Sequence, residues 1–227
     1  MTEQPSQAVQ DYLKAIHRLG GSDEFVKPNR IAEALGVKAP SVTGMLTRLA
    51  EAGWIEYESG KGARLAESGL GEALRVIRRH RLVELFLAQV LKLDWSEVDA
   101  EAEALEHAIS PRLEQALADY LGEPHEDPHG HPIPSRTGVL KERNLLQLSQ
   151  CRAGQTVVVR EAQDDNPNRL RHWHSHGLTP GARVRILSYQ ELDDLFEIEV
   201  EGKLIRLGSE GLAGLRGEVL SPAAPPA

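Results

Sequence analysis

The chain has 227 residues, 41% of them hydrophobic and 26% charged, a composition typical of a globular protein with two or three modest domains. Its net charge of −8 and pI near 5.6 exclude a protein that coats nucleic acid through bulk positive charge. No apolar run is long enough to cross a bilayer and no signal peptide is visible, so we expect a cytoplasmic protein without a membrane partner. The single cysteine, Cys151, excludes an internal disulfide and is expected to pack in a core.

Three helices and a hairpin are predicted in the N-terminal third. Apolar residues recur at helical spacing over residues 8–19, and Asp11 lies among them, which the pattern alone explains as the edge of the apolar stripe. Two further helices are predicted over residues 30–35, with Asn29 as N-cap, and over residues 40–52. Strands over residues 54–58 and 63–66 flank a glycine-rich turn. This order predicts a winged helix-turn-helix domain over residues 1–74.

Local positive charge and small side chains surround the second helix of this motif, although the net charge of the chain is negative. Such residues permit close approach to base edges and phosphates of double-stranded DNA. A helix-turn-helix that serves only for packing is the alternative, and the wing that follows favours DNA binding. The predicted contact residues are Lys27, Arg30, Lys38, Ala39, Pro40, Ser41, Thr43, Gly44 and Arg48, with Lys61 and Arg64 on the wing.

Residues 96–110 are predicted to form a helix whose composition is hard to explain by folding alone. One face is apolar, with Val98, Ala102, Leu105 and Ile109, and the adjacent face carries Asp99, Glu103, Glu106 and His107. Like charges one turn apart destabilise a helix by roughly 0.2–0.5 kcal/mol per pair, and a bound divalent cation would reverse that effect. The alternatives are a solvated helix face and a capping box between Ser96 and Asp99.

A long helix is predicted from Ser68 to about Leu91. His80 and Glu84 interrupt its apolar face one turn apart, a spacing at which two side chains can bind one ion. The remaining face is apolar enough to pack against a second subunit, which predicts a symmetric homodimer and a palindromic DNA operator. A third helix follows over residues 111–121. The connector with His125, His129 and His131 is interpreted as a proline-spaced loop without ligand geometry.

The C-terminal part changes to short β-rich runs separated by Gly, Pro and Asp, which predicts a small barrel over residues 146–220. Three histidines there alternate as a strand would display them and are expected at the surface: His172, His174 and His176. Residues 221–227 are expected to be a disordered tail.

From Asp11 through Pro134 the chain resembles the DtxR/MntR family of metal-dependent transcriptional regulators, through the winged helix, RRHRLVELFL, EALEHAIS and DPHGHPIP. RLRHWHSHGLTPGARVRIL and FEIEVEGKLIRLG resemble the SH3-like, FeoA-type domain of longer members. The resemblance implies a mainly α fold with small β parts, in which residues 75–142 are a helical dimerisation and metal-binding domain. It also implies a homodimer that represses metal-uptake genes in response to Mn(II) or Fe(II).

The resemblance implies a primary metal site made of Asp11, Glu103, Glu106 and His107. It implies an ancillary or second-ion site made of His80, Glu84 and Asp99. The C-terminal domain can lend further ligands, which here fall near Asp164 and Asp165, with a solvated turn as the alternative.

The iron-responsive branch of the family has a methionine and a cysteine where this chain has Asp11 and Glu103. Hard oxygen ligands favour Mn(II), with Fe(II) or Co(II) as alternative ions and no organic cofactor. Lys14 stands where the manganese branch has another carboxylate, which departs from a closely spaced two-ion arrangement. No catalytic residue is predicted. The rival hypotheses are a metallohydrolase that uses the same cluster and a winged-helix regulator that senses an organic molecule.

Overall fold

A computed structural model describes residues 5–141, 143–163 and 166–221 of the chain. These residues belong to two units, one comprising Met1–His80, Glu103–Glu114 and Pro134–Leu140 and the other Arg81–Ala102, Gln115–Ile133 and Lys141–Ala227. The division passes through one long helix, α4 (Glu67–Gln89). No described helix combines the length and the apolar character needed to cross a membrane.

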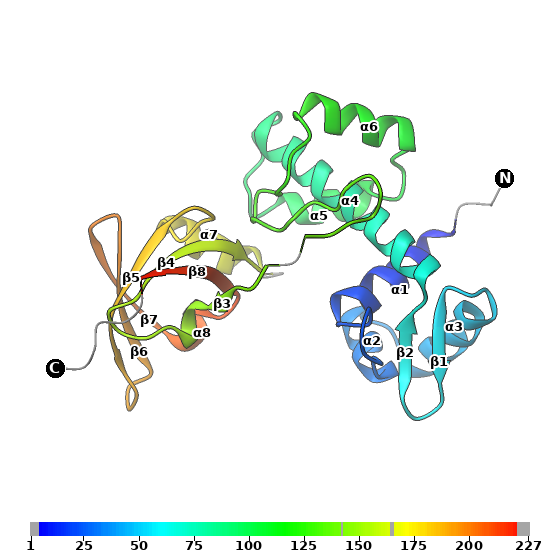
Figure 1. Ribbon diagram of the computed structural model, residues 1–227, viewed down its shortest axis with the longest axis horizontal. Coiled ribbons are helices and arrows are strands. Elements are labelled where there is room, and N and C mark those ends of the chain that lie inside the picture. The colour runs from blue at the N-terminus through cyan, green and yellow to red at the C-terminus, as the bar shows by residue number, and fades with distance from the viewer. Residues whose placement is uncertain (1–4, 142, 164–165, 222–227) are drawn as a thin grey trace. The chain divides into compact units, whose positions relative to one another are not determined.

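The first unit begins with a winged helix-turn-helix, drawn in blue to cyan in Figure 1. Its elements are α1 (Gln7–Arg18), α2 (Pro28–Ala34), α3 (Ala39–Glu51), β1 (Ile55–Glu58) and β2 (Gly62–Leu65). Apolar residues at helical spacing bury one face of each helix in a shared core that includes Leu13, Ile31 and Leu46. Proline supplies the fixed φ that opens both α2 and α3, and Lys27, not Asn29 as predicted, is the N-cap of α2.

The wing is the antiparallel hairpin of β1 and β2, in which Ile55 pairs with Leu65 and Glu58 with Gly62. Backbone hydrogen bonds of 2.8 and 2.9 Å join Ala63 to Val26 and attach the hairpin to the segment before α2. Gly62 has φ +121°, and a Cβ there would lie 2.1 Å from the carbonyl oxygen of Val26. Glycine is therefore required where the wing meets the body of the domain.

The predicted acidic helix is shorter in the structure than in the sequence analysis. α5 comprises Val98–Leu105, and Glu106 and His107 lie in the turn that follows it. Val98 and Ala102 are fully buried as predicted, but Leu105 is 43% exposed, so the expected apolar stripe ends with the helix. α6 (Pro111–Tyr120) begins at a proline, as predicted.

α4 ends at Gln89, two residues before the predicted end, and Leu91 is 54% exposed. In the second unit, Leu82 and Leu85 of α4 pack with Ala118 of α6 and with Ile133 in a small apolar cluster. Burial of these side chains holds α6 and the connector against α4.

The second unit also contains a six-stranded antiparallel sheet with strand order β3-β8-β4-β5-β6-β7. Its strands are β3 (Leu146–Gln147), β4 (Thr156–Ala162), β5 (Arg183–Gln190), β6 (Leu195–Val200), β7 (Lys203–Gly208) and β8 (Leu215–Ser221). α7 (Pro167–Ser175) and α8 (Ser209–Leu212) complete the domain, and a short 3-10 turn (Leu148–Gln150) follows β3. Alternate residues of β6 face the core, where Phe196 and Ile198 pack with Trp173 of α7 and with Cys151. The fold class predicted from the sequence is confirmed.

The prediction that His172, His174 and His176 alternate along a strand is wrong. His172 and His174 lie in α7, and His176 is its C-cap residue. The side chain of Asn166 caps the helix by accepting a hydrogen bond from the backbone N–H of Asn168, and Pro167 occupies the first helical turn.

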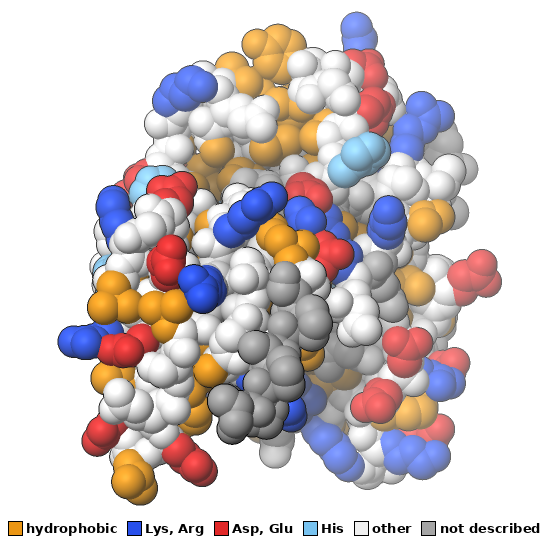
Figure 2. Space-filling model, turned by 60° about the vertical axis from the view of Figure 1, so that its left-hand side comes forward, with side chains coloured by type: hydrophobic (Ala, Val, Ile, Leu, Met, Phe, Trp, Pro, Cys, Tyr) orange, Lys and Arg blue, Asp and Glu red, His pale blue; other side chains and the backbone are white. Residues whose placement is uncertain are grey.

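The surface mixes the two signs of charge. On the face shown in Figure 2, basic and acidic side chains are interspersed. In the six-stranded sheet, neighbouring strands carry exposed ion pairs such as Arg160–Glu218 at 2.9 Å and Arg206–Glu197 at 2.7 Å. Such pairs contribute roughly 0–1 kcal/mol each and serve solubility more than stability.

Candidate metal centre

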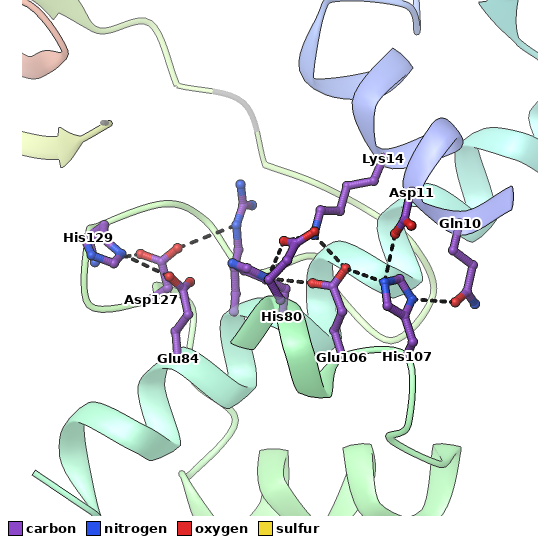
Figure 3. Close-up of polar contacts among 11 residues, drawn as sticks. Gln10, Asp11, Lys14, His80, Glu84, Glu106, His107, Asp127 and His129 are labelled. Atoms are coloured by element: carbon purple, nitrogen blue, oxygen red, sulfur yellow. Dashed lines mark hydrogen bonds and ion pairs between the residues drawn. The ribbon is translucent and has the colours of Figure 1, made fainter. Parts of the chain in front are cut away.

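Six ionisable side chains meet where α1 approaches the turn after α5, and we call them the first cluster (Figure 3). α1 contributes two residues one helical turn apart, α4 contributes one, and α5 with its following turn contributes three. The members are Asp11, Lys14, His80, Glu103, Glu106 and His107. The structure thus brings together all four residues predicted for the primary site, and it adds His80 and Lys14 to them.

Glu106 lies at the centre of the first cluster and is fully buried. One of its oxygens, Oε2, lies 2.5 Å from Nδ1 of His80. The other, Oε1, lies 2.6 Å from Nζ of Lys14 and 3.3 Å from Nε2 of His107. Two sets of potential ligands share Glu106: it combines with Asp11 and His107 in one set and with His80 and Glu103 in the other.

Two polar atoms of the first cluster are buried without a hydrogen-bond partner, namely Oδ1 of Asp11 and Nε2 of His107. They lie 2.9 Å apart, and Figure 3 shows Asp11 and His107 pointing toward each other. Buried polar atoms are almost always paired, because an unpaired one costs roughly 1–3 kcal/mol. A carboxylate oxygen and an imidazole nitrogen are both ligands for divalent cations, so these residues fit a bound metal ion.

The environments of the two central carboxylates shift their pKa values in opposite directions. Burial raises the pKa of Asp11, with further raising by Glu103 and Glu106, against lowering by His107 and Lys14. Burial also acts to raise the pKa of Glu106, but the hydrogen bond from His80 and the charge of Lys14 outweigh it and lower the pKa. Glu106 is therefore held as a carboxylate, whereas Asp11 lacks a comparable stabilising partner.

Lys14 is only 3% exposed and donates to two carboxylates at once. Its Nζ lies 2.6 Å from Oε2 of Glu103 and 2.6 Å from Oε1 of Glu106. A buried ammonium with two such partners is stable only because they offset its loss of hydration. Lys14 therefore supplies a fixed positive charge between two of the predicted ligands and ties α1 to α5 and its turn.

The residues predicted for the ancillary site lie on two helices, His80 and Glu84 on α4 and Asp99 on α5. His80 and Glu84 lie one turn apart on α4, with His80 in the first unit. Glu84 and Asp99, both in the second unit, have carboxylate oxygens within 4.8 Å of each other. Asp164 and Asp165, predicted as further ligands, lie outside the described residues.

The second unit contains a further group of ionisable side chains, which we call the second cluster: Glu84, Asp127, His129 and His131. Glu84 was predicted for the ancillary site, whereas the two histidines were interpreted as part of a loop without ligand geometry. Nδ1 of His129 lies 3.2 Å from Glu84, and its Nε2 lies 2.8 Å from the carbonyl oxygen of Trp95. Oδ1 of Asp127 accepts backbone N–H groups of His129 and His131 at 2.8 and 2.9 Å. The interpretation of the connector as a loop without ligand geometry is therefore wrong.

Backbone contacts fix the connector loop against the sheet. The N–H of Ala162 in β4 donates to the carbonyl oxygen of His129 at 3.0 Å. Gly130 has φ +85°, and a Cβ there would lie 1.8 Å from the carbonyl oxygen of Arg160, so only glycine allows this approach. The Asp-x-His spacing was the available signal, because an Asp side chain that accepts backbone N–H groups two residues on orders a turn.

Charge in the second cluster is largely satisfied internally. Burial acts to raise the pKa of Asp127, but His131, Arg81 and His129 outweigh it and lower the pKa far below its usual range. Burial acts to lower the pKa of His129, but its hydrogen bond to Glu84, with the charges of Glu84 and Asp127, raises it overall. The imidazole of His129 is therefore held in its protonated form more strongly than an ordinary histidine.

The predicted DNA contacts lie on α2, α3 and the wing, and all of them except Arg64 are exposed. The basic side chains of the wing have acidic partners: Lys61 pairs with Glu58 and Arg64 with Glu56, both at 2.6 Å. Both also lie over the ring of Phe25, at 5.7 and 5.0 Å from its centroid. The two cations of the wing therefore share their charge with acidic neighbours.

Comparison with known proteins gives three family-model matches. Residues 6–63 match the N-terminal DNA-binding domain of iron-dependent repressors, residues 66–135 match their metal-binding and dimerisation domain, and residues 146–214 match the FeoA domain. The iron-dependent repressor IdeR of Mycobacterium tuberculosis is 35% identical over 192 residues, covering 77% of this chain and 81% of that protein.

Solved structures agree. A manganese-dependent transcriptional repressor in complex with manganese superposes with a TM-score of 0.86 at 36% identity, covering 93% of this chain and 100% of the other. The manganese regulator SloR gives a TM-score of 0.75 at 30% identity over 96% of this chain and 100% of that one. The chain belongs to the DtxR/MntR family of metal-dependent transcriptional repressors.

Proposed function

We propose that this protein is a Mn(II)-responsive repressor of metal-uptake genes that binds a palindromic DNA operator as a homodimer. The observation that carries the proposal is the pair of buried atoms of Asp11 and His107 that lie 2.9 Å apart without a hydrogen bond, beside the carboxylate of Glu106. The family consists of transcriptional repressors and not of enzymes, so the metallohydrolase hypothesis is not retained.

The ion would be held by Asp11, Glu103, Glu106 and His107, a set of three carboxylates and one imidazole. Carboxylate oxygens suit Mn(II), whereas softer sulfur ligands select other metals. Because no sulfur ligand stands among the four, we place Mn(II) before Fe(II) and Co(II). The manganese-bound relative and the iron-dependent IdeR are both similar to this chain, so the preference rests on the ligand types.

The residues of the first cluster link the DNA-binding module to the segment after α5. Asp11 lies on α1, which packs in the core of the winged helix, whereas Glu106 and His107 lie in the turn after α5. A bound ion would supply positive charge to Asp11 and Glu106, which repel each other without it. Side chains from both elements would then favour one orientation of α1, and DNA that fits this orientation would in turn tighten metal binding.

We propose that the first cluster takes a single divalent ion. The set that contains His80, Glu103 and Glu106 already faces the ammonium of Lys14, which lies 2.6 Å from both carboxylates. A second divalent ion beside these carboxylates would be repelled by this charge. The ion would then lie among Asp11, Glu106 and His107, with Glu103 as a ligand that it shares with Lys14.

For the ancillary site we keep His80, Glu84 and Asp99 as a proposal and add His129 and Asp127 of the second cluster. His129 lies 3.2 Å from Glu84, which supports its inclusion. Metal binding there would require the proton shared by His129 and Glu84 to leave, so we expect weaker binding than at the first cluster.

DNA contact is proposed for the exposed basic and small residues of α2 and α3, with Lys61 and Arg64 on the wing. The match to a metal-binding and dimerisation domain supports a homodimer, whose two recognition helices would read two half-sites.

Metal-dependent DNA binding tests the proposal. A fragment enriched from a random pool in a mixture of Mn(II), Fe(II), Co(II) and Zn(II) would be titrated with protein at fixed salt, with each ion separately and with chelator. We expect the tightest binding with Mn(II) and a loss with chelator. Equal affinity with and without metal would overturn the mechanism, and tighter binding with Fe(II) would overturn the ion preference.

A further inference from the structure

A series of buried, hydrogen-bonded side chains leads from Glu72 through Gln10 to His107 of the first cluster. Glu72 and Gln10 are not among the proposed ligands. Gln10 of α1 and Glu72 of α4 are 4% and 5% exposed. Nε2 of Gln10 donates to Oε1 of Glu72 at 2.7 Å, and Oε1 of Gln10 lies 2.7 Å from Nδ1 of His107. Figure 3 shows Gln10 on the opposite side of His107 from Glu106.

The chemistry of these partners determines which way the amide of Gln10 faces. A carboxylate only accepts hydrogen bonds, so Glu72 requires the NH₂ group of Gln10. Arg75 pairs with the other oxygen of Glu72 at 3.2 Å. The amide oxygen of Gln10 must then face His107, and the ring can meet it only by donating from Nδ1.

The opposite edge of the ring faces acceptors as well. Nε2 of His107 lies 2.9 Å from Oδ1 of Asp11 and 3.3 Å from Oε1 of Glu106. Without an acceptor at Nδ1, the single proton of a neutral imidazole would move to Nε2, where two carboxylates attract it. A proton at Nε2 would block the nitrogen that faces the candidate ion position.

We propose that Gln10, oriented by Glu72, is a positioning residue that keeps His107 in the Nδ1–H tautomer and so leaves Nε2 open for a divalent cation. The ion-binding part of this inference rests on the proposed function. The tautomer itself is a property of the metal-free protein and is measured separately.

The test uses the full-length, metal-free protein labelled with ¹⁵N at histidine. Long-range ¹H–¹⁵N correlation spectra distinguish the two tautomers, and the His107→Gln variant identifies the signals of His107. We expect Nδ1–H in the wild-type protein. An Nε2–H ring in the wild-type protein would overturn the proposal without reference to any variant.

Gln10→Met removes the amide at similar length. We expect His107 to change to the Nε2–H form and Mn(II) affinity, measured by electron paramagnetic resonance, to fall roughly 10- to 100-fold. Gln7→Met, one helical turn earlier on α1 and exposed, is the matched control and should leave both readouts unchanged. A Gln10→Met protein that keeps the Nδ1–H tautomer and its Mn(II) affinity would overturn the proposal.

A double variant that exchanges the two residues, Gln10→Glu with Glu72→Gln, tests whether Gln10 acts by orienting His107 or only by filling space in the core. The carboxylate of the new residue at position 10 would accept from Nδ1 of His107 and from the amide at position 72, so the same tautomer and Mn(II) binding should return. Failure of the folded exchange variant to restore the tautomer would contradict the proposal. A wild-type protein with the Nδ1–H tautomer but no Mn(II) binding would refute the proposed function and leave the tautomer assignment standing.

Discussion

The two clusters of the molecule contain similar residues but differ in how their polar atoms are satisfied. In the second cluster, both ring nitrogens of His129 and both oxygens of Asp127 face partners, including Arg81 at 3.6 Å. In the first cluster, Oδ1 of Asp11 and Nε2 of His107 are buried without a hydrogen-bond partner. Ligand types alone therefore do not distinguish an ion site from a hydrogen-bond network, whereas potential ligand atoms that are buried without a hydrogen bond favour an ion site.

The two clusters also differ in how far their carboxylates are balanced by positively charged groups. The first cluster has three carboxylates against one fixed cation, Lys14. The second cluster pairs its two carboxylates with two histidines and the guanidinium of Arg81. We infer that the first cluster gains most from a divalent cation and that the second chiefly holds the connector loop to α4.

The largest expected effect is a difference in metal-dependent DNA binding between variants of the first and of the second cluster. His107→Gln should reduce metal-dependent DNA binding on the order of 100-fold or more, because it removes a proposed ligand, whereas His129→Gln should reduce it less than about tenfold. Titration of each variant with Mn(II) in the DNA-binding assay checks this. An equal loss in both variants would contradict the distinction between the clusters.

For the stability of the metal-free protein, we expect the second cluster to matter more than the first. His129→Ala removes one partner of a buried pair and should lower the free energy of unfolding of the metal-free protein by about 3 kcal/mol. Trp95 stacks on His129 with 5.2 Å between ring centroids, so tryptophan fluorescence during urea unfolding reports on this region. His131→Ala, at a more exposed member of the same cluster, is the comparison, and a smaller loss for His129→Ala than for His131→Ala would count against this account.

Lys14→Met tests whether a fixed charge limits the first cluster to one ion. In a His129→Ala background, which weakens the second cluster, Mn(II) stoichiometry should rise from about one to about two per chain, because the ammonium no longer opposes a second dication. Lys203→Met, at an exposed residue of β7, controls for net charge. An unchanged stoichiometry of one with unchanged affinity would show that Lys14 does not exclude the second ion.

The smallest expected effect concerns pH and Asp11. Burial raises the pKa of Asp11 in the folded state, so its contribution to stability is present below its unfolded pKa and is lost as the pH rises through the folded pKa. Asp11→Asn should therefore raise the Tm of the metal-free protein at pH 7, by about 2–4 °C if the gain is near 1 kcal/mol. A lower Tm at pH 7 would contradict the burial cost assigned to Asp11.

Glu106 should show the opposite pH dependence, because its pKa is lowered whereas that of Asp11 is raised. Its lowered pKa contributes stability that is present above its unfolded pKa and is lost as the pH falls through the folded pKa. Glu106→Gln should therefore lower the Tm at pH 7, and the difference from wild type should shrink in acid.

Elements were predicted correctly from the sequence where the apolar residues keep one spacing, either helical or alternating, along the whole element. α1, α3, the wing and the start of α6 at Pro111 follow from this spacing and from proline at helix starts. The turn after Leu105 was missed because the helical spacing of Glu103, Glu106 and His107 continues past the end of the helix. In α7, alternating histidines suggested a strand, although Asn166-Pro167 carried the signal of a helix start.

The residues proposed for the primary site followed from the family resemblance, whereas their surroundings did not. The contacts of Lys14 with Glu103 and Glu106 span 89 and 92 positions of the sequence, and the contact of Gln10 with His107 spans 97. No local pattern encodes such pairs. Asp127 and His129 were missed because the order of their loop depends on β4, which lies further along the chain.

Anomalous diffraction at the manganese edge, from crystals of the full-length protein grown with Mn(II), tests the central claim most directly. We expect the strongest manganese peak in the first cluster, bounded by Oδ1 of Asp11, the carboxylate of Glu106 and Nε2 of His107. A peak confined to Glu84 and His129, or none beside Asp11 and His107, would contradict the account.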